Sequence, residues 1–180
     1  ELITPEIYGE EPGVFAKTVY RVYAEYQKEL FKANAMDFDD LLMKLVLLFE
    51  KHPNILESYQ EIYRYIHIDE YQDTNRAQYR LIKLLASKYR NLFVIGDDAQ
   101  SIYSFRAATI RNILDFPTQF PGTTVVTLEQ NYRSTQPILA AANAVMAAAK
   151  ERYTKELYSD RKSQLKPRLI TCMDEAEQTE

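Results

Sequence analysis

Three short apolar runs, each followed by acidic or amide residues, constrain the fold of this 180-residue chain most strongly. They are rich in β-branched and aromatic side chains and span residues 65–68, 92–95 and 125–128. Segments with helical spacing separate them, and strands that alternate with helices are typical of a parallel α/β sheet. Because the runs are continuously apolar, we predict strands that are buried on both faces.

The polar residues behind the three runs are expected to share one edge of this sheet. In chain order they are Asp69, Glu70, Asp97, Asp98, Glu129 and Gln130. In open parallel sheets, ligands bind beyond the carboxyl ends of the strands. The sequence therefore places its polar chemistry where a ligand is expected.

Apolar residues at helical spacing predict helices around the strands. Those expected before the first run cover residues 15–30, 37–49 and 53–64. Asp37 can cap the second of them, because a short acidic side chain accepts the free N–H groups of a first helical turn. Asp73 or Thr74 can cap a helix after the first run, and Ser134 or Thr135 can cap an alanine-rich helix after the third.

Composition and charge exclude several classes of protein. A net charge of −4 is not the balance of a chain that grips nucleic acid by charge alone. No stretch is long enough for a membrane-spanning helix, and the lone Cys172 excludes an internal disulfide and fits a reducing compartment. Basic residues outnumber acidic ones from Lys150 to Arg168, which is typical of a solvated face or linker. The start at Glu1, without Met or a targeting signal, indicates a cut inside a longer protein.

Asp69 and Glu70 form the first candidate site. One carboxylate can hold Mg²⁺, directly or through water, and its neighbour can orient or deprotonate an attacking water. The alternative interpretation is a pair of solvated acids that ends a strand.

Residues 96–106 form the second candidate site. Gln100 can sense a phosphate oxygen without adding charge. The segment also carries aromatic rings interleaved with a cation, the mix that stacks bases and holds nucleic-acid backbone: Tyr103, Phe105 and Arg106. The alternative is the start of a buried helix with core aromatics.

Residues 128–134 form the third candidate site. Arg133, just before a helix, can place a rigid guanidinium fork on phosphate. Tyr132 can stack on a base. The alternative is a surface ion pair beside a core ring.

Four segments resemble motifs of the UvrD/PcrA/Rep helicases. The string Asp69-Glu70-Tyr71-Gln72-Asp73-Thr74-Asn75 is similar to the Walker B motif of that family. Residues 96–106 resemble its motif III, residues 128–135 its motif IV, and residues 35–42 a segment upstream of Walker B. Four matches in the family's order are far more specific than any one of them.

The resemblance implies a role for each candidate residue. Asp69 and Glu70 would coordinate Mg²⁺, and Glu70 would also be the base for the attacking water. Gln100 would report the γ-phosphate of ATP to the DNA site. Arg133 would be an arginine finger, and Tyr132 would stack on adenine. The residues that would meet single-stranded DNA are Tyr103, Phe105 and Arg106.

The implied fold is α/β: a partial RecA-like P-loop NTPase motor domain, preceded by helices of an inserted accessory domain. Residues 1–60 would be the accessory-domain remnant and its connection into the motor. Residues 61–149 would be part of the first motor domain, and residues 150–180 a basic linker and the start of the second, with its first strand at 168–172.

The implied function is that of an ATP-dependent DNA helicase in repair or replication, cytoplasmic and associated with the nucleoid. It would couple hydrolysis of Mg-ATP to 3'-5' translocation on single-stranded DNA and to unwinding at duplex junctions.

The sequence departs from the family pattern in three respects. Phe105 and Ala107 stand where relatives often have Trp and Gly. No Gly-x-x-x-x-Gly-Lys-Ser/Thr segment occurs, and the four glycines cannot build a phosphate cradle. We therefore expect the isolated chain to be inactive. We also expect the strand at 125–128, having lost its neighbour, to pair with residues 92–96 or with another chain.

Two other functions stay open. Residues 160–162, Asp-Arg-Lys, match the acid-x-Lys element of a metal-dependent nuclease family, although the expected Pro-Asp partner is absent. The chain could also be a non-catalytic nucleic-acid or protein interaction module descended from a helicase, but the intact candidate residues speak against such decay.

Overall fold

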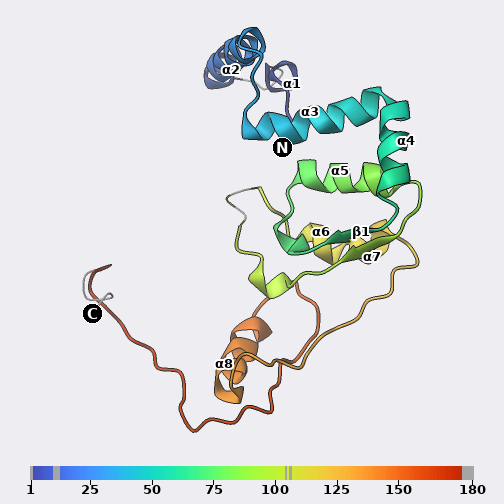
Figure 1. Cartoon of the computed structure of the whole chain (residues 1–180). Coiled ribbons are helices and arrows are strands. Elements are labelled where there is room, and N and C mark those ends of the chain that lie inside the picture. Colours follow the sequence, from blue (N-terminus) through green and yellow to red (C-terminus); the bar gives the residue numbers. More distant parts are fainter. Residues whose placement is uncertain (1, 10–12, 104, 106, 176–180) are drawn as a thin grey trace. The chain divides into compact units, whose positions relative to one another are not determined.

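The computed structural model describes residues 2–9, 13–103, 105 and 107–175 in two compact units, Glu1–Phe116 (unit 1) and Pro117–Glu180 (unit 2) (Figure 1). The elements before the first strand are α1 (Pro5–Gly9), α2 (Val14–Lys32), α3 (Phe38–Lys51) and α4 (Pro53–Ile62). Those that follow are β1 (Ile66–Ile68), η1 (Tyr71–Asp73), α5 (Arg76–Ala86), β2 (Leu92–Val94), η2 (Asp98–Gln100), α6 (Arg111–Leu114), α7 (Phe116–Gln119) and α8 (Gln136–Ala147). None of the described helices combines the length and hydropathy needed to cross a bilayer.

The helices of unit 1 begin largely where the sequence predicts. The Asp37 carboxylate accepts the Asp40 N–H at 2.8 Å and caps α3, and Pro53 opens α4. For α5 the predicted caps are wrong, because Asn75 caps it by accepting the Gln78 N–H at 3.0 Å. Its two predicted caps lie in and after the 3₁₀ turn η1, where the Thr74 hydroxyl donates to a backbone carbonyl instead.

The sheet of unit 1 has two parallel strands. β1 and β2 pair in the register Ile66↔Leu92, His67↔Phe93 and Ile68↔Val94. The prediction that both faces are buried is wrong. His67 is exposed and the Phe93 side chain is 57% exposed, and their rings lie 5.5 Å apart on one face of the sheet.

The predicted third strand does not form. Residues 123–129 adopt no regular structure, and Val126, meant for a strand core, is 74% exposed. They pair neither with residues 92–96 nor with any other strand of the described chain. A strand needs a ladder partner for its N–H and C=O groups, and without one it gains little over hydrated coil. Residues 168–172, predicted as the first strand of a second motor domain, also form no strand.

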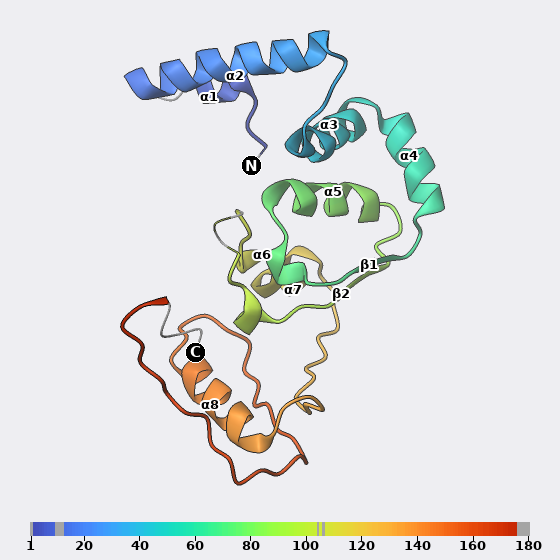
Figure 2. The same cartoon turned by 60° about the vertical axis from the view of Figure 1, so that its left-hand side comes forward.

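The core of unit 1 lies around α5. Both views show this helix between α3 and the sheet (Figures 1 and 2). Its buried residues are Ala77, Ile82 and Ala86, and those of α3 include Val46 and Phe49. Below η1, the Tyr71 ring meets Phe116 edge-on, with ring centroids 5.4 Å apart. This packing fixes the turn that follows β1.

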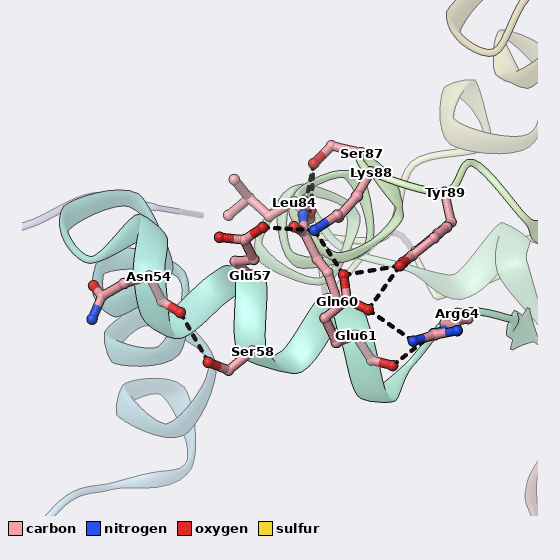
Figure 3. A network of polar contacts seen from close by, with 10 residues as sticks. All are labelled: Asn54, Glu57, Ser58, Gln60, Glu61, Arg64, Leu84, Ser87, Lys88 and Tyr89. Carbon is pink, nitrogen blue, oxygen red and sulfur yellow. Dashed lines mark hydrogen bonds and ion pairs between the residues drawn. The ribbon is translucent and has the colours of Figure 1, made fainter.

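A polar network ties α4 to the end of α5 (Figure 3). The buried Gln60 amide donates to the Leu84 carbonyl at 2.8 Å and to the Ser87 hydroxyl at 2.9 Å. The Lys88 ammonium pairs with two carboxylates of α4, at 2.6 Å from Glu57 and 2.7 Å from Glu61. Since β1 follows α4 directly, this network also fixes where β1 begins.

The apolar face of α2 is largely exposed. Only Ala16 of this helix is buried, whereas Phe15 and Val22 stay in solvent. Helical spacing therefore predicts the helix correctly, but most of its apolar face stays uncovered in the part of unit 1 that the structure describes.

In unit 2, α8 lies between two segments without regular structure that contact one another. The Asn143 side chain accepts the Leu157 N–H at 3.1 Å and donates to the Leu157 carbonyl at 2.8 Å. Gln130 forms a parallel bridge with Tyr158. α8 starts after Thr135, one of the two predicted caps, but the Thr135 side chain makes no capping hydrogen bond.

Candidate functional site

The acidic pair lies at the carboxyl end of β1. Asp69 and Glu70 are both exposed, and the Asp69 carboxylate accepts the Glu70 N–H at 2.9 Å. The Glu70 backbone is left-handed, with φ 50° and ψ 42°. That conformation is costly for a residue with a Cβ and persists where the surrounding structure enforces it. Here it turns the chain sharply from β1 into η1 and leaves both acids at the edge of the sheet.

The second segment lies at the carboxyl end of β2. The Asp97 carboxylate accepts the Ala99 N–H at 3.1 Å and the Gln100 side-chain amide at 2.7 Å. Gln100 is exposed. Because β1 and β2 are parallel and in register, this segment and the acidic pair share one edge, as the sequence predicts. Glu129 and Gln130 belong to unit 2 and are not part of this sheet.

Gln72 connects the two segments, and sequence reasoning did not single it out. Its side chain is fully buried. Its amide nitrogen donates to the Glu70 carboxylate at 2.7 Å, and its amide oxygen accepts the Asp97 N–H at 3.0 Å. An amide flanked by acids is a signal for such a link, since it donates to carboxylates without adding charge.

Gly96 permits this close approach. A Cβ at this position would stand 2.6 Å from the Ile113 Cδ1 atom and 2.8 Å from the Gln72 amide oxygen. Both distances are shorter than carbon side chains tolerate. Any larger residue at 96 must therefore displace both the Gln72 amide and the Ile113 side chain of α6.

Asn112 of α6 supports the turn through hydrogen bonds to Thr74. Its buried amide donates to the Thr74 carbonyl at 2.9 Å and to the Thr74 hydroxyl at 3.1 Å. The Thr74 hydroxyl in turn donates to the Tyr71 carbonyl at 2.7 Å. Side-chain hydrogen bonds from Asn112 and Thr74 thus hold the end of η1.

The predicted DNA-binding rings are exposed. The Phe105 side chain is 76% exposed, and its ring centroid lies 5.7 Å from that of Tyr103, which is also exposed. The alternative of core aromatics is therefore wrong for Phe105. Arg106, the third predicted member of this set, lies outside the described residues.

The third predicted site lies in unit 2. Tyr132 is 76% exposed, and Arg133 is exposed. The Asn131 side chain accepts the Arg133 N–H at 2.9 Å, while Arg161 donates to the Tyr132 and Arg133 carbonyls at 3.2 and 2.7 Å. The backbone is thus held from both sides while the two side chains face solvent. The alternative of a core ring is wrong for Tyr132.

The residues at the sheet edge fit a magnesium ion better than a complete nucleotide. Within the described part of the chain, no group of three or more His, Cys, Asp or Glu side chains could hold a metal. Mg²⁺, however, is commonly held by one or two carboxylates, with water and substrate phosphates completing its shell. The exposed oxygens of Asp69 and Glu70 suit that mode. A glycine-rich phosphate cradle is absent from the sequence.

The fold and the candidate site are those of a helix-rich α/β protein, with the acidic pair and the Gln100 segment at the carboxyl edge of a small parallel sheet. Residues 3–121 match the UvrD/REP helicase N-terminal domain, and the chain belongs to that family.

Individual relatives agree with this assignment. ATP-dependent DNA helicase PcrA of Bacillus subtilis (strain 168) is 50% identical over 161 residues, which are 89% of this chain and 22% of that protein. DNA helicase II of Rickettsia typhi is 53% identical over 157 residues, 87% of this chain and 24% of that protein. ATP-dependent DNA helicase PcrA of Staphylococcus aureus (strain Mu50) is 47% identical over 181 residues, 100% of this chain and 25% of that protein. The chain thus spans about a quarter of the length of these relatives.

Proposed function

We propose that this chain supplies part of the motor of an ATP-dependent DNA helicase. The observation that carries the proposal is the shared sheet edge, where the exposed Asp69 and Glu70 stand beside the segment that carries Gln100. The family membership and the names of the relatives support the same function. The motor would move 3'-5' on single-stranded DNA, open duplex junctions and act at the nucleoid in the cytoplasm.

The acidic pair would perform the hydrolytic chemistry. Asp69 would hold Mg²⁺ together with Glu70, and the ion, when bound, would neutralise charge on the phosphates of ATP. Glu70 would accept a proton from the attacking water, because its carboxylate is exposed and held at one oxygen by Gln72. Gln100 would contact a phosphate oxygen through its neutral amide.

Two residues of unit 2 carry further nucleotide-binding roles in this proposal. Arg133 would act as the arginine finger, since its exposed guanidinium makes no ion pair within the described residues and its backbone is clamped. Tyr132 would stack on adenine. We use "full-length helicase" for a protein that contains both this chain and a P-loop. The remaining phosphate contacts would come from that P-loop.

The nucleic-acid contact would lie just after Gln100. The neighbouring rings of Tyr103 and Phe105 would stack on bases of single-stranded DNA, and Arg106 would hold its backbone.

No observation among the described residues favours the nuclease. Asp160 of its acid-x-Lys triplet accepts a hydrogen bond from Gln130. Nothing described favours a non-catalytic interaction module either.

The test is Glu70→Gln in the full-length helicase. This change removes the base but keeps the shape of the side chain. It should abolish DNA-stimulated ATP hydrolysis while nucleotide affinity, measured with a fluorescent ATP analogue, changes little. Normal turnover by this variant would exclude Glu70 as the base.

A further inference from the structure

The side chain of Gln72 uses both ends of its amide, although it is the most deeply buried polar side chain of the site, with no exposed surface. Its nitrogen donates to Glu70 at 2.7 Å and lies 3.4 Å from the Asp73 carboxylate, and its oxygen accepts the Asp97 N–H at 3.0 Å. We propose that Gln72 is a positioning residue, which orients the Glu70 carboxylate and couples it to Gln100. This inference rests on the proposed function, in which Glu70 is the catalytic base.

Glu70 needs such a partner because the rest of its surroundings leave it unrestrained. Its side chain is exposed, and a glutamate has three rotatable bonds. A general base must stay within hydrogen-bond reach of the water it deprotonates. The Gln72 donor fixes one carboxylate oxygen and leaves the other for that water.

The same amide links the base to the predicted phosphate sensor. Gln72 holds the backbone N–H of Asp97, and the carboxylate of Asp97 holds the side-chain amide of Gln100 at 2.7 Å. The Ser101 hydroxyl adds a longer contact, 3.5 Å from the Gln72 carbonyl. A movement of Gln100 toward a phosphate therefore displaces Asp97, and through Gln72 it reorients the Glu70 carboxylate.

Gln60 provides a matched control. It is a second buried glutamine of unit 1, and its amide also donates two hydrogen bonds, to Leu84 and Ser87. It belongs to the α4–α5 network and forms no hydrogen bond with the described site residues. A variant at Gln60 therefore reports what the loss of a buried amide does to folding alone.

The experiment compares Gln72→Leu with Gln60→Leu in the full-length helicase, after thermal melting has measured the stability of both. Gln72→Leu should lower kcat for DNA-stimulated ATP hydrolysis by about 10- to 100-fold, the usual cost of losing a residue that orients a functional ligand, with the KM for ATP nearly unchanged. Gln60→Leu should lower the melting temperature and leave kcat per folded molecule as it was. Equal kcat values for Gln72→Leu and the parent, measured on folded protein, would overturn the inference.

Gln72→Glu gives a readout that a purely structural role would not move. The introduced side chain has nearly the size of the amide and can still accept the Asp97 N–H, but a carboxylate has no hydrogen to donate to Glu70. The kcat of this variant should therefore fall about as far as that of Gln72→Leu, with the KM for ATP nearly unchanged, although the link to Asp97 is kept. A kcat equal to that of the parent would contradict the positioning role.

The Glu70→Gln variant separates this inference from the proposed function. If Glu70→Gln is inactive while both Gln72 variants hydrolyse ATP normally, Glu70 is the base and Gln72 does not position it. If Glu70→Gln is fully active, the assignment of the base fails, and the inference fails with it.

Discussion

At the scale of single residues, the phenol of Tyr71, the residue after the acidic pair, is a buried and unsatisfied group. The side chain is fully buried, and its hydroxyl has no hydrogen-bond partner in the described structure. Burial raises the pKa of this phenol well above its usual range, so the hydroxyl stays neutral. An unsatisfied buried hydroxyl costs about 1–3 kcal/mol, so Tyr71→Phe should raise the free energy of unfolding by roughly 1 kcal/mol in urea titrations of the chain.

Tyr89→Phe is the control for that change. The Tyr89 hydroxyl donates to the Glu61 carboxylate at 2.8 Å, so its removal should destabilise the chain. A loss of stability in both variants would show that the Tyr71 hydroxyl has a partner and would refute the prediction.

A second residue-scale prediction concerns Phe105. Because this ring is 76% exposed, Phe105→Ala should change the free energy of unfolding by no more than about 0.5 kcal/mol. If the ring stacks on a base, the same variant of the full-length helicase should bind single-stranded DNA more weakly by about 1–3 kcal/mol. Fluorescence anisotropy with a labelled oligonucleotide measures the affinity. Unwinding should fall more than ATP hydrolysis.

Phe105→Trp sharpens this test. The larger ring keeps a stacking face at an exposed position, so DNA affinity should be retained or improved. Unchanged affinity in the alanine variant would exclude the stacking role.

At the scale of elements, the joint between α4 and α5 depends on pH. Hydrogen bonds from Lys88 and Tyr89 lower the pKa of Glu61 from 4.5 to about 2. A carboxyl whose pKa is lowered by folding stabilises the fold above its unfolded pKa and ceases to do so as pH falls. Bonds to Glu57 and Glu61 likewise raise the pKa of Lys88 above its ordinary 10.5, so its contribution is lost only in strong alkali.

The melting temperature of the chain should therefore fall as pH drops from 4.5 toward about 2, in part through Glu61. Glu61→Gln should flatten this part of the profile, because its amide does not titrate. A matched control is Glu25→Gln, since the ion pair that Glu25 forms among the described residues is an exposed one with Lys28 within α2. Parallel acid profiles for Glu61→Gln and the parent would contradict the role of this network.

The local sequence pattern predicts where the helices form better than it predicts which residues precede them and pack against them. The spacing of apolar residues and the positions of Asp37 and Pro53 are local properties, and α2, α3 and α4 form where they indicate. The cap of α5 is Asn75 because η1 precedes the helix, and a 3₁₀ turn depends on the packing of Tyr71 and Phe116.

At the scale of the whole molecule, the chain has an acidic pair but no phosphate cradle. The P-loop lysine and backbone amides supply the main electrostatic clamp on the β- and γ-phosphates in motors of this chemistry. The purified 180-residue chain should therefore show no DNA-stimulated ATP hydrolysis above a Glu70→Gln control in a phosphate-release assay. Turnover that the Glu70→Gln change abolishes would refute this prediction.

The sequence by itself determined three features: the order of the motifs, the acidic pair at a strand end and the two paired strands. It could do so because apolar runs and the spacing of apolar residues are local properties, and each family motif is a contiguous segment. Tertiary structure alone decided the rest. The run at 125–128 has the composition of a strand, but a strand exists only where a partner completes its hydrogen bonds. In the sequence, Gln72 is one polar residue among several. In the structure, packing of η1 against α6 and the missing Cβ of Gly96 bury its side chain between two motifs. Burial and pairing depend on residues far away along the chain, which no local pattern contains.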